Sequence, residues 1–271
     1  MKKSINYPLS DSVSTVKKNI SPKWELYDDL ISQIPDGLVI KEVLIGIHWT
    51  MVRSTGVGLS MTQPNGPRSI PNAGGFSGCK LKKIAALVKS WHPHEAALGL
   101  AAINSYINAP ETIAKNWKTD PANQPNESVF LYMKPQLSGK KVTVVGHFPD
   151  LSELEPVCCL SILERNPMDG DFPDPACEYI LHDQDYLFIT GVTIINKTMP
   201  RLLELGRHAK IILVGPSVPL SPFWFKRGIF ALAGTTVTDS ADVWRHVAEG
   251  GDRSVFKHGA QMFKISPKDV R

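Results

Sequence analysis

Residues 139–149 read GKKVTVVGHFP, a short β-branched run that ends at Gly146 and continues directly into His147. Such a run is typical of the first strand of a nucleotide-binding α/β domain. Four more apolar runs follow it, with helical patterns between them, which predicts a parallel sheet covered on both faces. The four runs are CCLSILER (158–165), YLFITG (186–191), KIILVG (210–215) and IFALAGT (229–235). The helical patterns cover about 150–156, 175–182, 198–207, 221–227 and 240–248.

The glycine-rich phosphate loop of a dinucleotide-binding domain is incomplete after the first strand. When G-x-G-x-x-G is aligned on Gly146, the other two glycines are absent. Asp150 and Glu153 have the spacing of a capping box, which predicts a helix whose free amides are already satisfied and unsuited to pyrophosphate. Glu164, at the end of the second strand, suits a ribose hydroxyl but is weak evidence by itself.

His147 is the first candidate site residue, because a ligand crevice in such a sheet lies outside the carboxyl ends of the strands. A neutral imidazole there can serve as a metal ligand or as a general acid or base near physiological pH. A histidine that only caps the strand is the structural alternative. The later strands bring Thr190, Gly191 and Ser217 to the same edge.

Asn196 and Lys197 precede the predicted helix at 198–207. An asparagine at such a position caps the helix, and a lysine can hold an anionic group. A plain helix cap with a solvent-exposed lysine explains the same residues, so both interpretations stay open.

The first third of the chain predicts a smaller α+β domain. A helix is expected at 24–34, a small antiparallel sheet from 38–52 and 56–62, and two helices at 79–91 and 92–108. The second of these helices carries a face of small residues, which packs within its domain or across a homodimer. Prolines crowd residues 109–138, so we place the domain boundary there and expect domains at 1–125 and 126–271.

The segment WHPHE (91–95) places His92 and His94 close together in sequence. An H-x-H pair can share a metal ion, but Pro93 and the start of a helix make joint ligation geometrically difficult. Cys79 follows a long loop rich in glycine and proline, and it matters only if that loop folds over the site. The sequence leaves open whether these three side chains reach a cleft.

Composition excludes several classes of function. The net charge of +4 over 271 residues, with scattered Lys and Arg, does not favour nucleic acid as a partner. No stretch of about 18 apolar residues is present, so no membrane span is expected, and the N-terminus has no leader-like apolar core. We therefore expect a cytoplasmic protein. The four cysteines form no C-x-x-C pair, which argues against a zinc ribbon and a disulfide framework.

Four motifs together resemble a known two-domain family of bacteria and archaea. They are EAALGLAAINS (95–105), GKKVTVVGHFP (139–149), ITGVTIINKT (189–198) and LVGPSVPLSP (213–222). The family is named "putative heavy-metal chelation" and has long been called a domain of unknown function. The resemblance extends from about residue 20 to 260.

This resemblance implies a domain similar to the N-terminal domain of enolase, followed by a Rossmann-like domain, with a site in the cleft between them. Motif matching implies that the cleft is lined by Asn104, His147, Thr190, Gly191, Asn196, Lys197 and Ser217. Enolase activity is not implied, because that chemistry belongs to a separate barrel domain.

Two functions are consistent with these residues. The first is binding of a metal ion or metal chelate, with His147 as ligand and a transition-metal ion as the candidate cofactor. The alternative is an enzyme for a small polar metabolite or nucleotide-like ligand, in which Glu164 holds a cofactor, Lys197 an anionic group, and His147 transfers protons. A scaffold with an empty cleft is the third interpretation, and the sequence does not decide whether the protein is an enzyme.

Overall fold

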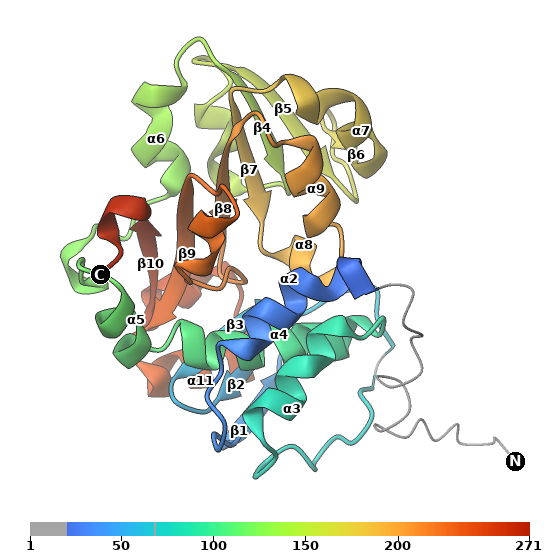
Figure 1. Cartoon of the computed structure of the whole chain (residues 1–271), viewed down its shortest axis with the longest axis vertical. Helices are drawn as coiled ribbons and strands as arrows, with labels where there is room; N and C mark the ends of the chain where they lie inside the picture. Colours follow the sequence, from blue (N-terminus) through green and yellow to red (C-terminus); the bar gives the residue numbers. More distant parts are fainter. Residues whose placement is uncertain (1–20, 68) are drawn as a thin grey trace, which may run out of the picture.

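The computed structural model describes residues 21–67 and 69–271 (Figure 1). This part of the chain forms a three-stranded antiparallel sheet and a seven-stranded, mostly parallel sheet, both covered by helices. The expected fold class, a Rossmann-like sheet with a smaller α+β unit before it, is confirmed.

The large sheet has the strand order β10-β9-β8-β7-β4-β5-β6. All neighbours are parallel except β9 and β10. The strand order reverses at β4, which lies between β5 and β7, and ligands of such sheets bind at this switch point. The strands are β4 (Lys141–Val145), β5 (Cys159–Glu164), β6 (Phe172–Pro173), β7 (Tyr186–Thr190), β8 (Lys210–Val214), β9 (Ala231–Val237) and β10 (Ala260–Ile265). The five expected strands are present, and the two-residue β6 and the antiparallel β10 were not predicted.

Helices connect these strands and cover both faces of the sheet (Figure 1). They are α6 (Val129–Leu137), α7 (Cys177–Ile180), α8 (Val192–Ile195), α9 (Met199–Leu205), α10 (Phe223–Lys226) and α11 (Ser240–Ala248). Short 3₁₀ segments are η3 (Pro121–Asn123), η4 (Pro149–Glu153), η5 (Asp174–Ala176), η6 (Leu181–Asp183), η7 (Arg253–Lys257) and η8 (Pro267–Asp269).

The helix expected at 150–156 is instead the single 3₁₀ turn η4, and the predicted capping box is wrong. Phe148 precedes the turn and makes no side-chain cap, while Glu153 forms an ion pair with Lys134 of α6, 3.0 Å away. The turn ends with the Leu154 amide donating to the Leu151 carbonyl, three residues before it, which is the hydrogen-bond pattern of a 3₁₀ helix. The loop after β4 therefore leads into this short turn and not into a long helix.

The smaller unit consists of α2 (Ser21–Ser32), β1 (Glu42–Ile45), β2 (Trp49–Arg53), β3 (Val57–Met61), α3 (Leu81–Ala85), η2 (Ala86–Lys89), α4 (Pro93–Ile107) and α5 (Pro110–Asn116). The expected single strand at 38–52 is divided into β1 and β2. The amide of Gly46 donates to the Trp49 carbonyl, 2.9 Å away, which closes a turn in the middle of the run. A continuous β-branched pattern does not reveal this turn, because the turn residues are themselves flanked by isoleucine.

Helix α4 lies at the centre of the molecule and is buried over most of its length. Its small residues allow two backbones to approach it closely. A Cβ added at Gly99 would lie 2.0 Å from the Val88 amide nitrogen, and one added at Gly58 of β3 would lie 2.1 Å from the Ser105 nitrogen. The small-residue face thus packs within the chain, against η2 and β3.

The C-terminal end of α4 also anchors the large sheet. Asn108, at the C-cap of α4, makes hydrogen bonds to the loop after β8 and to β9. These three hydrogen bonds join the end of α4 to the large sheet between residues that are far apart in sequence.

None of the helices in residues 21–67 and 69–271 has the length and apolar character needed to cross a membrane.

Candidate functional site

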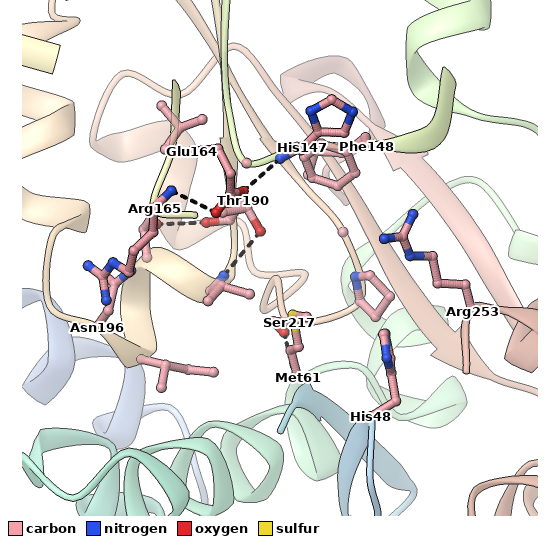
Figure 2. A pocket seen from close by; sticks show the side chains of 18 of the residues that line it. His48, Met61, His147, Phe148, Glu164, Arg165, Thr190, Asn196, Ser217 and Arg253 are labelled. Carbon is pink, nitrogen blue, oxygen red and sulfur yellow. Dashed lines mark hydrogen bonds between the residues drawn. The ribbon is translucent and has the colours of Figure 1, made fainter. Parts of the chain in front are cut away.

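A cleft of about 710 Å³ lies at the carboxyl ends of β4, β5, β7 and β8. The ends of β2 and β3, together with residues 63–65 and Trp91, form its opposite wall. Figure 2 shows His147 and Phe148 at one end of this site and His48 and Met61 at the other. The cleft thus lies at the topological switch point and between the two sheets, with a volume typical of small-molecule sites.

Six of the eight predicted site residues line this cleft: His147, Glu164, Thr190, Asn196, Lys197 and Ser217. The other two, Asn104 and Gly191, lie behind its wall. Both are buried and contact the backbone of the loop that carries Ser217. They belong to the support of the cleft and not to its surface.

His147 is held by a buried carboxylate. Its Nδ1 lies 3.0 Å from Asp171 Oδ2 and 3.1 Å from Oδ1, and the Asp171 side chain is only 2% exposed. A carboxylate accepts hydrogen bonds, so Nδ1 is the donor, and in the neutral imidazole the lone pair is then on Nε2. The imidazole itself is 31% exposed. This arrangement presents one oriented nitrogen lone pair, which suits either a metal ion or a proton.

Glu164 organises the rim beside His147. Its carboxylate accepts hydrogen bonds from three backbone amides, those of His147 (3.0 Å), Arg165 (2.7 Å) and Asn166 (3.2 Å). Both oxygens are therefore engaged, and the carboxylate joins the loop after β4 to the loop after β5. This bonding satisfies Glu164 without a ribose, although its oxygens still border the cleft.

Ser217 and the residues behind it join the loop after β8 to the smaller unit. The Ser217 hydroxyl accepts a hydrogen bond from the Met61 amide (3.0 Å), and Asn104 donates to the carbonyls of Leu59 (2.8 Å) and Ser217 (3.3 Å). Gly191 lies so close to this loop that an added Cβ would lie 2.6 Å from the Ser217 carbonyl carbon. This wall of the cleft is consequently built from both sheets and held together by hydrogen bonds.

Asn196 and Lys197 have separate roles at the opposite side of the cleft. The Asn196 side chain accepts hydrogen bonds from the amide (3.1 Å) and hydroxyl (2.6 Å) of Thr198, which orders the turn before α9. Lys197 donates from Nζ to two main-chain carbonyls, and burial lowers its pKa to about 8. Asn196 is therefore not the N-cap of α9, because Thr198 occupies that position and makes no side-chain cap bond. An anionic partner for Lys197 stays a prediction.

Several cleft residues were missed by sequence reasoning. They are His48, Trp91, Arg165 and Arg253, together with Asp171 behind His147. Arg165 is paired with Asp174 (3.0 Å). Burial, and then the guanidinium of Arg253, lower the pKa of His48. Trp91 could have been found, because it belongs to the WHPHE segment (91–95) that the sequence analysis had singled out for its histidines. Asp171 and Arg253 could not, because residues 166–175 and 251–256 show no periodic pattern.

His92, His94 and Cys79 do not line the cleft, although Trp91 and Pro93 beside them do. His92 caps α4 by accepting a long hydrogen bond (3.4 Å) from the Glu95 amide. Across the described ranges 21–67 and 69–271, no three His, Cys, Asp or Glu side chains lie close enough together to hold a metal ion. A site formed by protein ligands alone is therefore absent from this part of the chain.

Two family models match this chain, over residues 27–107 and 129–264, and both are described as "Putative heavy-metal chelation". A solved structure from Desulfitobacterium hafniense, of unknown function and from the family of the second match, is 41% identical with a TM-score of 0.84. The match covers 91% of this chain and 99% of that one.

Two further proteins are similar to this chain at lower sequence identity. A structure of the same family from Pyrococcus horikoshii, also of unknown function, is 20% identical with a TM-score of 0.73, covers 89% of this chain and 98% of that one, and shows the shared fold alone. An uncharacterized protein of Methanocaldococcus jannaschii is 27% identical over 194 residues, which are 68% of this chain and 71% of the relative.

Proposed function

We propose, from the premise that this chain belongs to the "Putative heavy-metal chelation" family, that its cleft binds a metal ion carried by an organic chelate. The observation that carries this proposal is the pair His147 and Asp171. A carboxylate that fixes the tautomer of a histidine is the usual support of a metal-ligating imidazole. His147 would then be the one protein ligand, bound to the metal through Nε2.

A complete chelate suits this site better than a bare ion. The described residues offer no cluster of three ligating side chains, so the remaining coordination positions must be filled by the bound molecule. The cleft volume of about 710 Å³ accommodates a small organic ligand. Lys197 also lines the cleft, and its protonated form suits an anionic arm of such a ligand.

The proposed domains, 1–125 and 126–271, place this cleft between two units. The two family matches end and begin on either side of that boundary, which supports the division. Each unit contributes one wall, with His147 and Ser217 from the second and Met61 from the first. Similarity of the first unit to the N-terminal domain of enolase remains an expectation from the resemblance.

Titration with Ni²⁺–nitrilotriacetate tests the proposal, because this chelate leaves coordination positions open to an imidazole. We expect calorimetric binding to the untagged protein, loss of binding in His147→Ala, and weakening by about 10- to 100-fold in Asp171→Asn. His182→Ala, at an exposed histidine far from the cleft lining, is the matched control. Undiminished binding by His147→Ala would refute the proposed ligand.

A second candidate function, an enzyme for a small polar or nucleotide-like ligand, is favoured by the same His147–Asp171 pair. A base with a free Nε2 and an orienting carboxylate is the usual arrangement of a general base. Melting curves at saturating nucleotide or adenosyl compounds test this candidate, because binding to the folded state raises the melting temperature. If none of these compounds changes the melting temperature, the enzyme candidate loses its support and chelate binding is the remaining candidate function.

A further inference from the structure

Lys197 has an unusual position in the wall of the cleft. It lies in the turn between α8 and α9, and Nζ donates hydrogen bonds to the carbonyls of Ser90 (2.5 Å) and Ile195 (2.6 Å). Four other lysines pair with carboxylates on the surface, at Asp36, Asp28, Glu153 and Asp183. In the described part of the chain, by contrast, Lys197 has two carbonyls and no carboxylate as partners.

The backbone at Lys197 is held in an unfavourable conformation. Its φ of 68° is in the left-handed region, which Asn72 alone shares among the described residues other than glycine. Asparagine tolerates this region, whereas lysine seldom adopts it, because its Cβ then lies too close to the neighbouring backbone. The surrounding turn must therefore impose it, and the result is that Nζ reaches across to Ser90, before α4.

The geometry at Nζ determines where the lone pair of the neutral amine points. A neutral amine has two N–H bonds and one lone pair in a tetrahedral arrangement with the chain carbon. If both N–H bonds donate to Ser90 and Ile195, the lone pair points away from both carbonyls. Burial lowers the pKa of this amine to about 8, so a substantial fraction is neutral near physiological pH. Lys197 borders the cleft, where that lone pair can meet a ligand.

We propose that Lys197 is a nucleophilic amine that forms an imine with the carbonyl carbon of an aldehyde or 2-oxo acid bound in the cleft. This activity goes beyond chelate binding and does not require a metal ion. Lysines with lowered pKa values in desolvated sites are known to act in this way on carbonyl compounds.

The proposed reaction balances without any further reactant. Nζ attacks the carbonyl carbon to give a carbinolamine, a proton moves from nitrogen to oxygen, and protonated hydroxyl leaves as water. The product is a protonated imine, which requires one proton from solvent. It keeps one N–H bond, and this bond can continue to donate to the carbonyl of Ser90 or Ile195. The indole ring of Trp91, with its centroid 5.8 Å from Nζ, covers one side of the nitrogen.

Reductive trapping at pH 7 tests this proposal on the full, metal-free chain. The protein is incubated with limiting glyoxylate and cyanoborohydride, and peptide mass spectrometry measures modification at each lysine over time. Exposed Lys226 is the internal reference. With a pKa of about 8, against about 10.4 for a lysine side chain in a model peptide, the neutral fraction of Lys197 at pH 7 exceeds that of a free lysine by about two orders of magnitude. We expect faster modification of Lys197, by at least about tenfold after allowance for its lower nucleophilicity.

Two controls separate reactivity from a structural role. Lys197→Arg keeps a cation and donors for the two carbonyls but cannot form an imine, and Lys226→Arg is the matched control. Selective labelling should be lost in the first variant, kept in the second, and lost in urea-denatured protein. Equal labelling of Lys197 and Lys226 in the folded protein would overturn the proposal. Lys197 would then be only a structural hydrogen-bond donor to the two carbonyls. Because no metal is present, this outcome is independent of the His147 experiment.

Discussion

Replacement of Asn108 by alanine tests how firmly the cleft wall is joined to α4. The Asn108 residue is 1% exposed, and its side chain makes three hydrogen bonds. Nδ2 donates to the carbonyls of Val218 (2.9 Å) and Thr235 (3.0 Å), and Oδ1 accepts from the Leu220 amide (2.7 Å). Val218 and Leu220 belong to the loop that carries the cleft residue Ser217, so the loss of these bonds acts directly on the site.

The magnitude follows from the three groups that lose their partner. Two carbonyls and one amide would be left buried and unsatisfied, each at a cost of about 1–1.5 kcal/mol, which gives a total of about 3–4.5 kcal/mol. The small cavity left by the amide adds to this cost unless water enters it. We therefore expect Asn108→Ala to lower the free energy of unfolding by at least about 3 kcal/mol.

Equilibrium unfolding in urea, followed by tryptophan fluorescence and by circular dichroism, measures this effect. Agreement between the two probes shows whether the two sheets unfold together. Asn123→Ala is the control, because Asn123 is exposed; we expect a change within about 0.5 kcal/mol. A loss below about 1 kcal/mol in Asn108→Ala would refute the reasoning that these bonds fix the wall.

Two further predictions follow from packing and from protonation. In Gly191→Ala the new Cβ would meet the backbone of Ser217 at 2.6 Å, so we expect about 1–3 kcal/mol of destabilisation and a lower melting temperature; an unchanged value would show that the loop can move. Burial, and then His92, lower the pKa of His94 below its ordinary 6.5, so the unfolded state binds more protons and stability falls as pH drops below about 6.5. His94→Gln should reduce this fall in stability between pH 7 and 5, measured by urea unfolding, whereas His182→Gln, at an exposed histidine, should not; an identical pH profile for both variants would contradict the assignment.

The architecture of the large sheet could be predicted because its strands are continuous apolar runs. Strands buried on both faces must be apolar throughout, and helical patterns between them require parallel crossovers. The missed elements had no such signal: β6 has two residues, and β10 pairs antiparallel with β9 at the edge of the sheet. The turn at Gly46 was missed because β-branched residues continue on both sides of it.

The candidate site was predictable only in part. Strand ends identified His147, Glu164 and Thr190, because the carboxyl ends of parallel strands meet at one edge regardless of their distance in sequence. Asn104 was implied by a motif to line the cleft, but it lies behind the cleft wall. A motif does not show which face of a helix borders a cleft, so this position could not be predicted. His48 lies in the turn between β1 and β2 of the smaller sheet and lines the same cleft.

The sequence by itself determined five of the seven strands of the large sheet, where each of these five ends, and thus which polar residues gather at that edge of the sheet. These are consequences of local hydrophobic patterns and of the fixed geometry of parallel strands. The tertiary structure alone decided that Asp171 orients His147, that Lys197 reaches the Ser90 carbonyl, and that Arg253 comes near His48. These contacts join loops distant in the chain, and loop conformation is set by what the loops pack against, which no local pattern encodes.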